Sequence, residues 1–124
     1  LLAQRPDLGN AVTDPRIREM DFGRWEQTAW DAVPRAAFDM WMADFAAHRF
    51  GGAESVEELI ARVADALDET RADLGAGGEA LWITHAGVIR SAIFLTQHGR
   101  RTIASAQEWP REAPDTGGWV MLDV

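Results

Sequence analysis

His85 and Gly87 stand where the sequence could place an anion. They follow an apolar run, Ala80 to Ile83, and precede a segment in which apolar residues recur at helical spacing, at Val88, Ile89, Ala92, Ile93 and Leu95. This order predicts a strand, a tight turn and then a helix. In an open α/β sheet, ligands bind at the carboxyl ends of the strands, where the first turn of the next helix presents unpaired N–H groups.

The two residues would contribute in different ways. Gly87 has no Cβ, so the backbone could approach a phosphate or a carboxylate closely there. His85 could donate a hydrogen bond to the same anion. In the alternative interpretation, the His85 side chain only caps the helix and satisfies a buried polar group. The residues by themselves leave both interpretations open.

A second candidate is the charged loop from Arg16 to Gly23, which includes Glu19. Its sequence has neither the period of a strand nor that of a helix. The loop ends with Phe22 and Gly23, and Trp25 follows it. Functional residues concentrate on loops that a rigid scaffold holds, so this loop is a candidate site. A solvated charged turn is the alternative.

The clearest predicted helix begins after Ser55. Ser55 and Glu58 have the spacing of a capping box, and Gly75 marks the end of the pattern. One face is apolar, at Val56, Leu59, Ile60, Val63, Leu67 and Leu74. The helix after Gly87 is expected to stop near Gly99. A shorter helical segment is expected from Thr28, with an interruption at Pro34.

Three short apolar runs are candidate strands, at residues 11–13, 80–84 and 119–122. Because they alternate with helices, the expected fold class is α/β, with three α/β/α layers and a mostly parallel sheet covered by helices on both faces. Three strands make a small sheet, so we expect further strands before Leu1, outside this chain. Residues 1–124 are expected to belong to a single domain.

Composition narrows the possible partners. The formal net charge is −8, which argues against sequence-independent binding to nucleic acid. No apolar run is long enough for a membrane helix, so we expect a cytoplasmic protein without a membrane partner. Cysteine is absent and His48 and His98 are isolated, so we expect neither a metal nor another cofactor.

Four segments together resemble the C-terminal part of the histidine phosphatase superfamily. This phosphoglycerate mutase-like superfamily includes small cofactor-independent phosphatases, α-ribazole phosphatases and the mutases themselves. The segments are REMDFGRWE (residues 18–26), GGAESVEELIARV (51–63), THAGVIR (84–90), and the stretch from WPREAP to Gly-Gly-Trp (109–119). The DFGRWE and WPREAP parts look most like the α-ribazole phosphatase type.

The resemblance implies a reaction and roles for particular residues. In such enzymes a phosphoryl group passes from a small phosphorylated substrate to a histidine in an Arg-His-Gly motif. By this similarity, Glu19 would be the catalytic acid and base, His85 would be the second catalytic histidine, and Ala86 and Gly87 would bind the phosphate through the backbone. These roles fit phosphoryl transfer, which needs preorganised donors around the phosphate and a proton for the leaving group.

The chain departs from the family pattern in two respects, because it contains neither an Arg-His-Gly motif nor a segment like the family's S-S-P-L-x-R-A-x-x-T-A. We therefore expect the 124 residues to be inactive alone, as the C-terminal part of a metal-independent phosphomonoesterase. A phosphoglycerate mutase-like transferase and a non-catalytic binding module that keeps part of the fold are the alternatives. The oligomeric state and the physiological substrate are left open.

Overall fold

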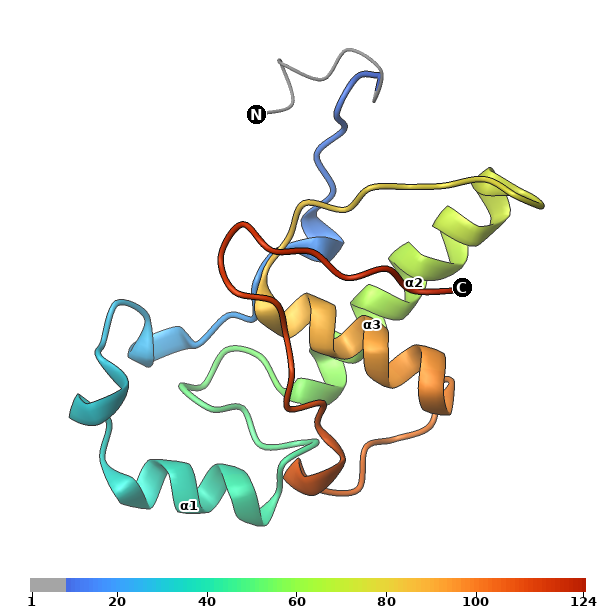
Figure 1. The fold of residues 1–124 in the computed structure, drawn as a ribbon. Coiled ribbons are helices and arrows are strands. Elements are labelled where there is room, and N and C mark those ends of the chain that lie inside the picture. Colours follow the sequence, from blue (N-terminus) through green and yellow to red (C-terminus); the bar gives the residue numbers. More distant parts are fainter. Residues whose placement is uncertain (1–8) are drawn as a thin grey trace.

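A computed structural model describes residues 9–124, and its regular structure within that range is helical (Figure 1). The α-helices are α1 (Arg35–Ala43), α2 (Val56–Leu74) and α3 (Ala86–His98). Four short 3-10 helices lie in the connecting segments: η3 (Pro15–Ile17), η4 (Gly23–Trp25), η5 (Trp30–Ala32) and η6 (Ala106–Glu108).

Helix α2 starts at the predicted capping box. The Ser55 hydroxyl accepts the Glu58 N–H at 3.1 Å, and the Glu58 carboxylate accepts the Ser55 N–H at 2.8 Å. Two backbone donors that the helix itself leaves unpaired are thereby satisfied. The helix ends at Gly75, as predicted, and its apolar face is buried at Val56, Leu59, Ile60, Val63, Ala64, Ala66 and Leu67.

Helix α3 also confirms the prediction for its part of the chain. It follows His85 directly, and it ends at Gly99, whose N–H donates to the Leu95 carbonyl at 2.8 Å. Helices α2 and α3 pack against each other, and α2 also packs against η3. Leu59 and Val63 of α2 lie with Val88 and Phe94 of α3 in one hydrophobic core. All four side chains are excluded from solvent. Each such side chain contributes roughly 1.5–3 kcal/mol relative to an exposed one.

The predicted α/β fold, with three layers and a mostly parallel sheet, is wrong for residues 9–124, which contain no strand. Residues 80–84 are non-helical, but their backbone groups form no ladder with another described segment. Leu81 and Ile83 are 59% and 60% exposed, whereas Trp82 between them packs against the core. The alternation expected of a strand is therefore present in the side chains, but a strand also needs a hydrogen-bonded neighbour. The candidate strands at 11–13 and 119–122 are likewise irregular.

The predicted helical segment after Thr28 becomes η5 and α1, with Pro34 between them. Phe38 and Trp41 of α1 stack on the fully buried Phe50, with ring centroids 5.3 and 4.4 Å away. Trp30 of η5 stacks on the same ring at 6.1 Å. This aromatic cluster holds α1 against the turn before α2.

None of the described helices is both long and apolar enough to cross a membrane.

Candidate functional site

Glu19 lies in the loop after η3 and reaches the amino end of α3. One carboxylate oxygen, Oε1, accepts the Met20 N–H at 2.9 Å. The other, Oε2, accepts the Gly87 N–H at 3.4 Å, which is a long hydrogen bond. Two candidate residues 68 positions apart are thus in contact. A carboxylate at this position is also favoured by the partial positive charge of the helix end.

Gly87 makes this contact possible because it has no side chain. A Cβ at this position would overlap Oε1 of Glu19 and would lie 3.5 Å from Cδ2 of Leu59. The missing Cβ of Gly87 therefore leaves room for a carboxylate beside the backbone. The anion in this structure is the carboxylate of Glu19.

His85 immediately precedes α3 and has an extended backbone, with φ −119° and ψ 166°. Its side chain accepts no hydrogen bond from the helix and is exposed. His85 is therefore the N-cap residue of α3 by position, but its side chain does not cap the helix, and the imidazole is exposed. The backbone just before it is fixed by Thr84, whose hydroxyl donates to the Ile17 carbonyl at 2.5 Å. Ala86 is the first residue of α3 and is partly buried.

An open hollow of about 440 Å³ lies beside Glu19. Its lining residues come from one loop and are Arg18, Glu19, Met20, Asp21, Phe22 and Glu26. His85, Ala86 and Gly87 do not line it, so the Glu19 side chain is the part of the hollow that contacts the amino end of α3.

Charge in the hollow is mostly negative, with three carboxylates and one arginine. The other two carboxylates are engaged by backbone: Asp21 accepts the Gly23 N–H at 2.8 Å, and Glu26 accepts the Phe22 N–H at 2.7 Å. These bonds shape the loop around η4. The hollow therefore holds few groups that could bind a phosphate.

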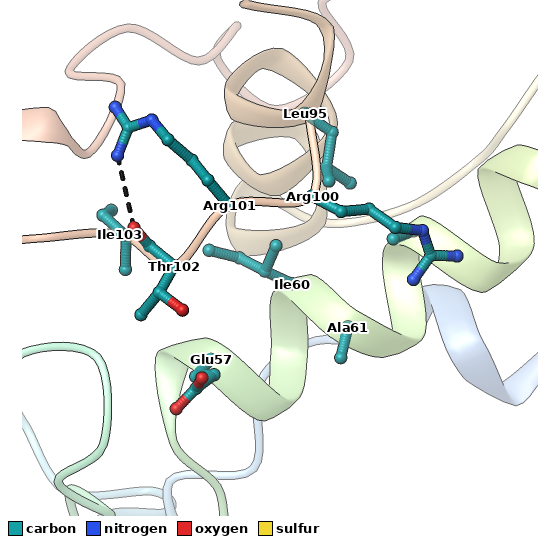
Figure 2. A pocket seen from close by; sticks show the side chains of 9 residues that line it. Glu57, Ile60, Ala61, Leu95, Arg100, Arg101, Thr102 and Ile103 are labelled. Atoms are coloured by element: carbon teal, nitrogen blue, oxygen red, sulfur yellow. Dashed lines mark hydrogen bonds between the residues drawn. The ribbon is translucent and has the colours of Figure 1, made fainter. Parts of the chain in front are cut away.

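A second, smaller cavity of about 140 Å³ lies where α2 faces the segment after α3 (Figure 2). Figure 2 shows its two arginines pointing in opposite directions. Both are paired with carboxylates. Arg100 donates to Asp65 at 2.9 Å and to Asp68 at 2.6 Å, and the hydrogen bond from Arg100 lowers the pKa of Asp68. Arg101 pairs with Glu108 and lies over the Phe94 ring, with Cζ 5.3 Å from its centroid. Both arginines of this cavity are paired with carboxylates, so it lies among structural ion pairs.

Within residues 9–124, no group of three or more His, Cys, Asp or Glu side chains is placed to hold a metal ion. His98 lies at the end of α3 with its ring 4.9 Å from that of Phe94.

Sequence reasoning gave no role to Arg62, which contacts the loop that carries Glu19. Its guanidinium donates to the carbonyls of Arg16, Arg18 and Glu19. One signal was available, because Arg62 stands beside Val63 at the border of the apolar face of α2, where a charged side chain requires a partner. The identity of that partner could not be read from the sequence.

Comparison with known proteins adds one finding to this geometry. No curated protein and no solved structure is similar enough to this chain to count as a match. The family model of the histidine phosphatase superfamily (branch 1) matches residues 1–110, which include Glu19, His85, Ala86 and Gly87. The match spans most of the 124 residues, so the chain belongs to the histidine phosphatase superfamily, and its function is of the phosphatase or phosphotransferase type.

Proposed function

We propose that this chain supplies the acid and base and the second histidine of a metal-independent phosphomonoester hydrolase that acts through a phosphohistidine intermediate. The observation that carries the proposal is the contact between Glu19 and Gly87, which brings the carboxyl group to the helix end that His85 precedes. Family membership supplies the reaction class, and this contact supports the roles of the residues.

Glu19 has the chemistry required of the proton donor. When an alkyl phosphate transfers its phosphoryl group, the leaving alkoxide needs a proton, and hydrolysis of the intermediate then needs a base to activate water. A carboxyl group beside an open hollow can do both in succession. His85, with an accessible imidazole, donates to the phosphoryl oxygens, whose charge must be stabilised in the transition state.

The phosphate and the Glu19 carboxylate compete for one hydrogen-bond donor, the Gly87 N–H. In the free chain this N–H is occupied by Oε2 of Glu19. A phosphoryl oxygen that took over the N–H would release Glu19 toward the leaving group. Protonation of Glu19 favours this exchange because a neutral carboxyl does not repel the phosphate. Ala86 and Gly87 thus act through their backbone, with the missing Cβ of Gly87 leaving room for either anion.

The nucleophile belongs to a segment outside these residues, because the chain has no Arg-His-Gly motif. The single arginine in the hollow also leaves the phosphate with too few cationic partners. The chain alone is therefore inactive. Hydrolysis is favoured over a mutase reaction because the stretch between Glu26 and Gly51 is short, and a mutase must retain its substrate while it reorients. A small α-ribazole-type phosphate is the proposed substrate class, and the cytoplasm is the proposed location.

The test uses what we call the complete enzyme, in which this chain follows a segment that carries the Arg-His-Gly motif. Hydrolysis of an aryl phosphate is measured in the presence of a metal chelator, with the 124-residue chain as a control. The complete enzyme should turn over and form an acid-labile phosphohistidine, and the control should do neither. A rate that requires added metal, or equal rates for both proteins, would contradict the proposal.

A further inference from the structure

The guanidinium of Arg62 makes hydrogen bonds with all five of its N–H donors. Three of these bonds go to backbone carbonyls: Nη1 donates to Arg16 at 2.7 Å and to Arg18 at 2.9 Å, and Nη2 donates to Glu19 at 3.1 Å. The other two go to the carboxylate of Glu54, from Nε at 2.6 Å and from Nη2 at 3.1 Å. One side chain of α2 therefore holds the loop at three residues, including the one that carries the candidate acid.

Glu54 contacts the same loop at Asp21. Its Oε2 atom accepts the Asp21 N–H at 2.9 Å in addition to the hydrogen bond from Arg62. The side chains of Arg62 and Glu54 are only 16% and 10% exposed. Burial weakens competition from water, so such a bidentate pair fixes its geometry more firmly than a surface ion pair does.

The loop between these contacts includes Glu19 and Met20. Its backbone is held on the amino side at Arg16 and Arg18, at Glu19 itself, and on the carboxyl side at Asp21. The Glu19 side chain is then the part of the residue left to move between the Gly87 N–H and the hollow. None of these backbone contacts uses the Glu19 carboxylate, whose own hydrogen bonds come from the N–H groups of Met20 and Gly87.

We infer that Arg62 and Glu54 are positioning residues, which fix the backbone of the Glu19 loop so that the carboxyl group is held at the amino end of α3. This inference rests on the proposed role of Glu19 in proton transfer. Arg62→Lys is the decisive change, because a lysine keeps the charge beside Glu54 but cannot reach three carbonyls and a carboxylate from one rigid plane.

A matched control is Arg100→Lys. Arg100 also pairs with carboxylates of α2, Asp65 and Asp68, but it lines the cavity in Figure 2. Within residues 9–124 it forms no hydrogen bond or ion pair with the Glu19 loop. Glu54→Gln is a second variant, which removes the charge of the pair and retains an oxygen for the Asp21 N–H.

The first measurement is amide hydrogen exchange, followed by NMR in the 124-residue chain. In Arg62→Lys and in Glu54→Gln, the amides of Met20 and Asp21 should exchange at least tenfold faster, relative to core amides such as that of Val63. Arg100→Lys should leave this ratio unchanged. An unchanged ratio in Arg62→Lys, or equal acceleration of loop and core amides, would overturn the inference, because Arg62 would then act only on global stability.

The second measurement compares an alkyl and an aryl phosphate in the complete enzyme. Arg62→Lys should lower kcat for the alkyl phosphate at least tenfold more than for the aryl phosphate, and should add no further loss in a Glu19→Ala background. Equal losses on both substrates overturn the positioning role. If Glu19→Ala itself shows no leaving-group dependence, the proposed function fails, and hydrogen exchange alone then decides whether the pair holds the loop.

Discussion

At the scale of single residues, Glu19 and His85 have different expected roles, and the leaving group separates them. In the complete enzyme, Glu19→Ala should lower turnover of an alkyl phosphate by roughly 10²- to 10⁴-fold, because the leaving alkoxide loses its proton donor. The loss should be much smaller for an aryl phosphate, whose leaving group needs no proton. Steady-state kinetics with both substrates measures the contrast.

His85→Ala should behave differently in the same assay. It removes a donor to the transferring phosphoryl group itself, so both substrates should lose turnover by a similar factor, on the order of 10² or more. Wild-type turnover in this variant, or the same leaving-group dependence in both variants, would show that the two roles are wrongly assigned.

Glu108 gives a residue-scale prediction about pH. Hydrogen bonds from Arg101 and from the Ala104 N–H lower its pKa to about 2, from an ordinary value of 4.5. Since the folded-state pKa is the lower one, the stabilisation is present above pH 4.5 and is lost as the pH falls toward 2. Glu108→Gln should therefore lower Tm at pH 7, and the difference from wild type should shrink between pH 4.5 and 2.

The control for this change is Glu112→Gln, since Glu112 is exposed and forms no ion pair in the described part of the chain. Its Tm difference should be near zero across the same range. If the difference in Tm between Glu108→Gln and wild type stays constant down to pH 2, the ionised carboxylate is not the source of that difference.

At the scale of elements, the contact between the η4 loop and the turn before α2 depends on Gly51. Gly51 has φ +84°, and a Cβ there would overlap the Phe22 carbonyl. Its own carbonyl accepts the Arg24 N–H at 3.0 Å. This contact positions the turn that contains Phe22, which lines the hollow beside Glu19.

A comparison of two single variants, Gly51→Ala and Gly52→Ala, should separate backbone strain from steric overlap. Gly52 has a similar φ of +90°, but a Cβ there meets only the mobile end of Arg24 at 3.4 Å. Both changes should cost about 1–3 kcal/mol through the left-handed backbone, and Gly51→Ala should cost clearly more. Urea unfolding measures the free energy of unfolding of each variant. Equal losses of that free energy would mean that the η4 loop shifts to accommodate the added Cβ without cost.

At the scale of the whole molecule, the irregular segments expose apolar side chains on backbone that has no ladder partner among residues 9–124. Leu81 and Ile83 are more than half exposed, and so are Trp119 and Met121. Extended backbone with exposed apolar residues favours pairing with another chain. We therefore expect self-association of the 124-residue chain at micromolar concentration.

Replacing Leu81 and Ile83 together with threonine should reduce this association, as measured by analytical ultracentrifugation. The control is the replacement of Met40 and Met42, which are 61% and 46% exposed but lie on α1, where the helix satisfies the backbone. Equal effects of the two pairs would mean that exposed apolar area alone, and not the extended backbone, causes the association.

The sequence by itself determined the elements whose signals are local. The capping box at Ser55, the apolar spacing after Val56 and the turn at Gly87 predicted α2 and α3, because caps and helical periodicity act over a few residues. The motifs around Glu19 and His85 likewise predicted the superfamily that the family model shows.

Only the tertiary structure decided the features that depend on distant parts of the chain. A sheet requires a partner for each strand, so the apolar run at 80–84 could not establish one, and the predicted α/β layers were wrong for the described residues. The contact of Glu19 with Gly87 joins residues far apart in sequence, and so does the contact of Arg62 with the loop. Which side chain occupies a helix end depends on how the helices pack, and the buried faces of α2 and α3 decide that packing.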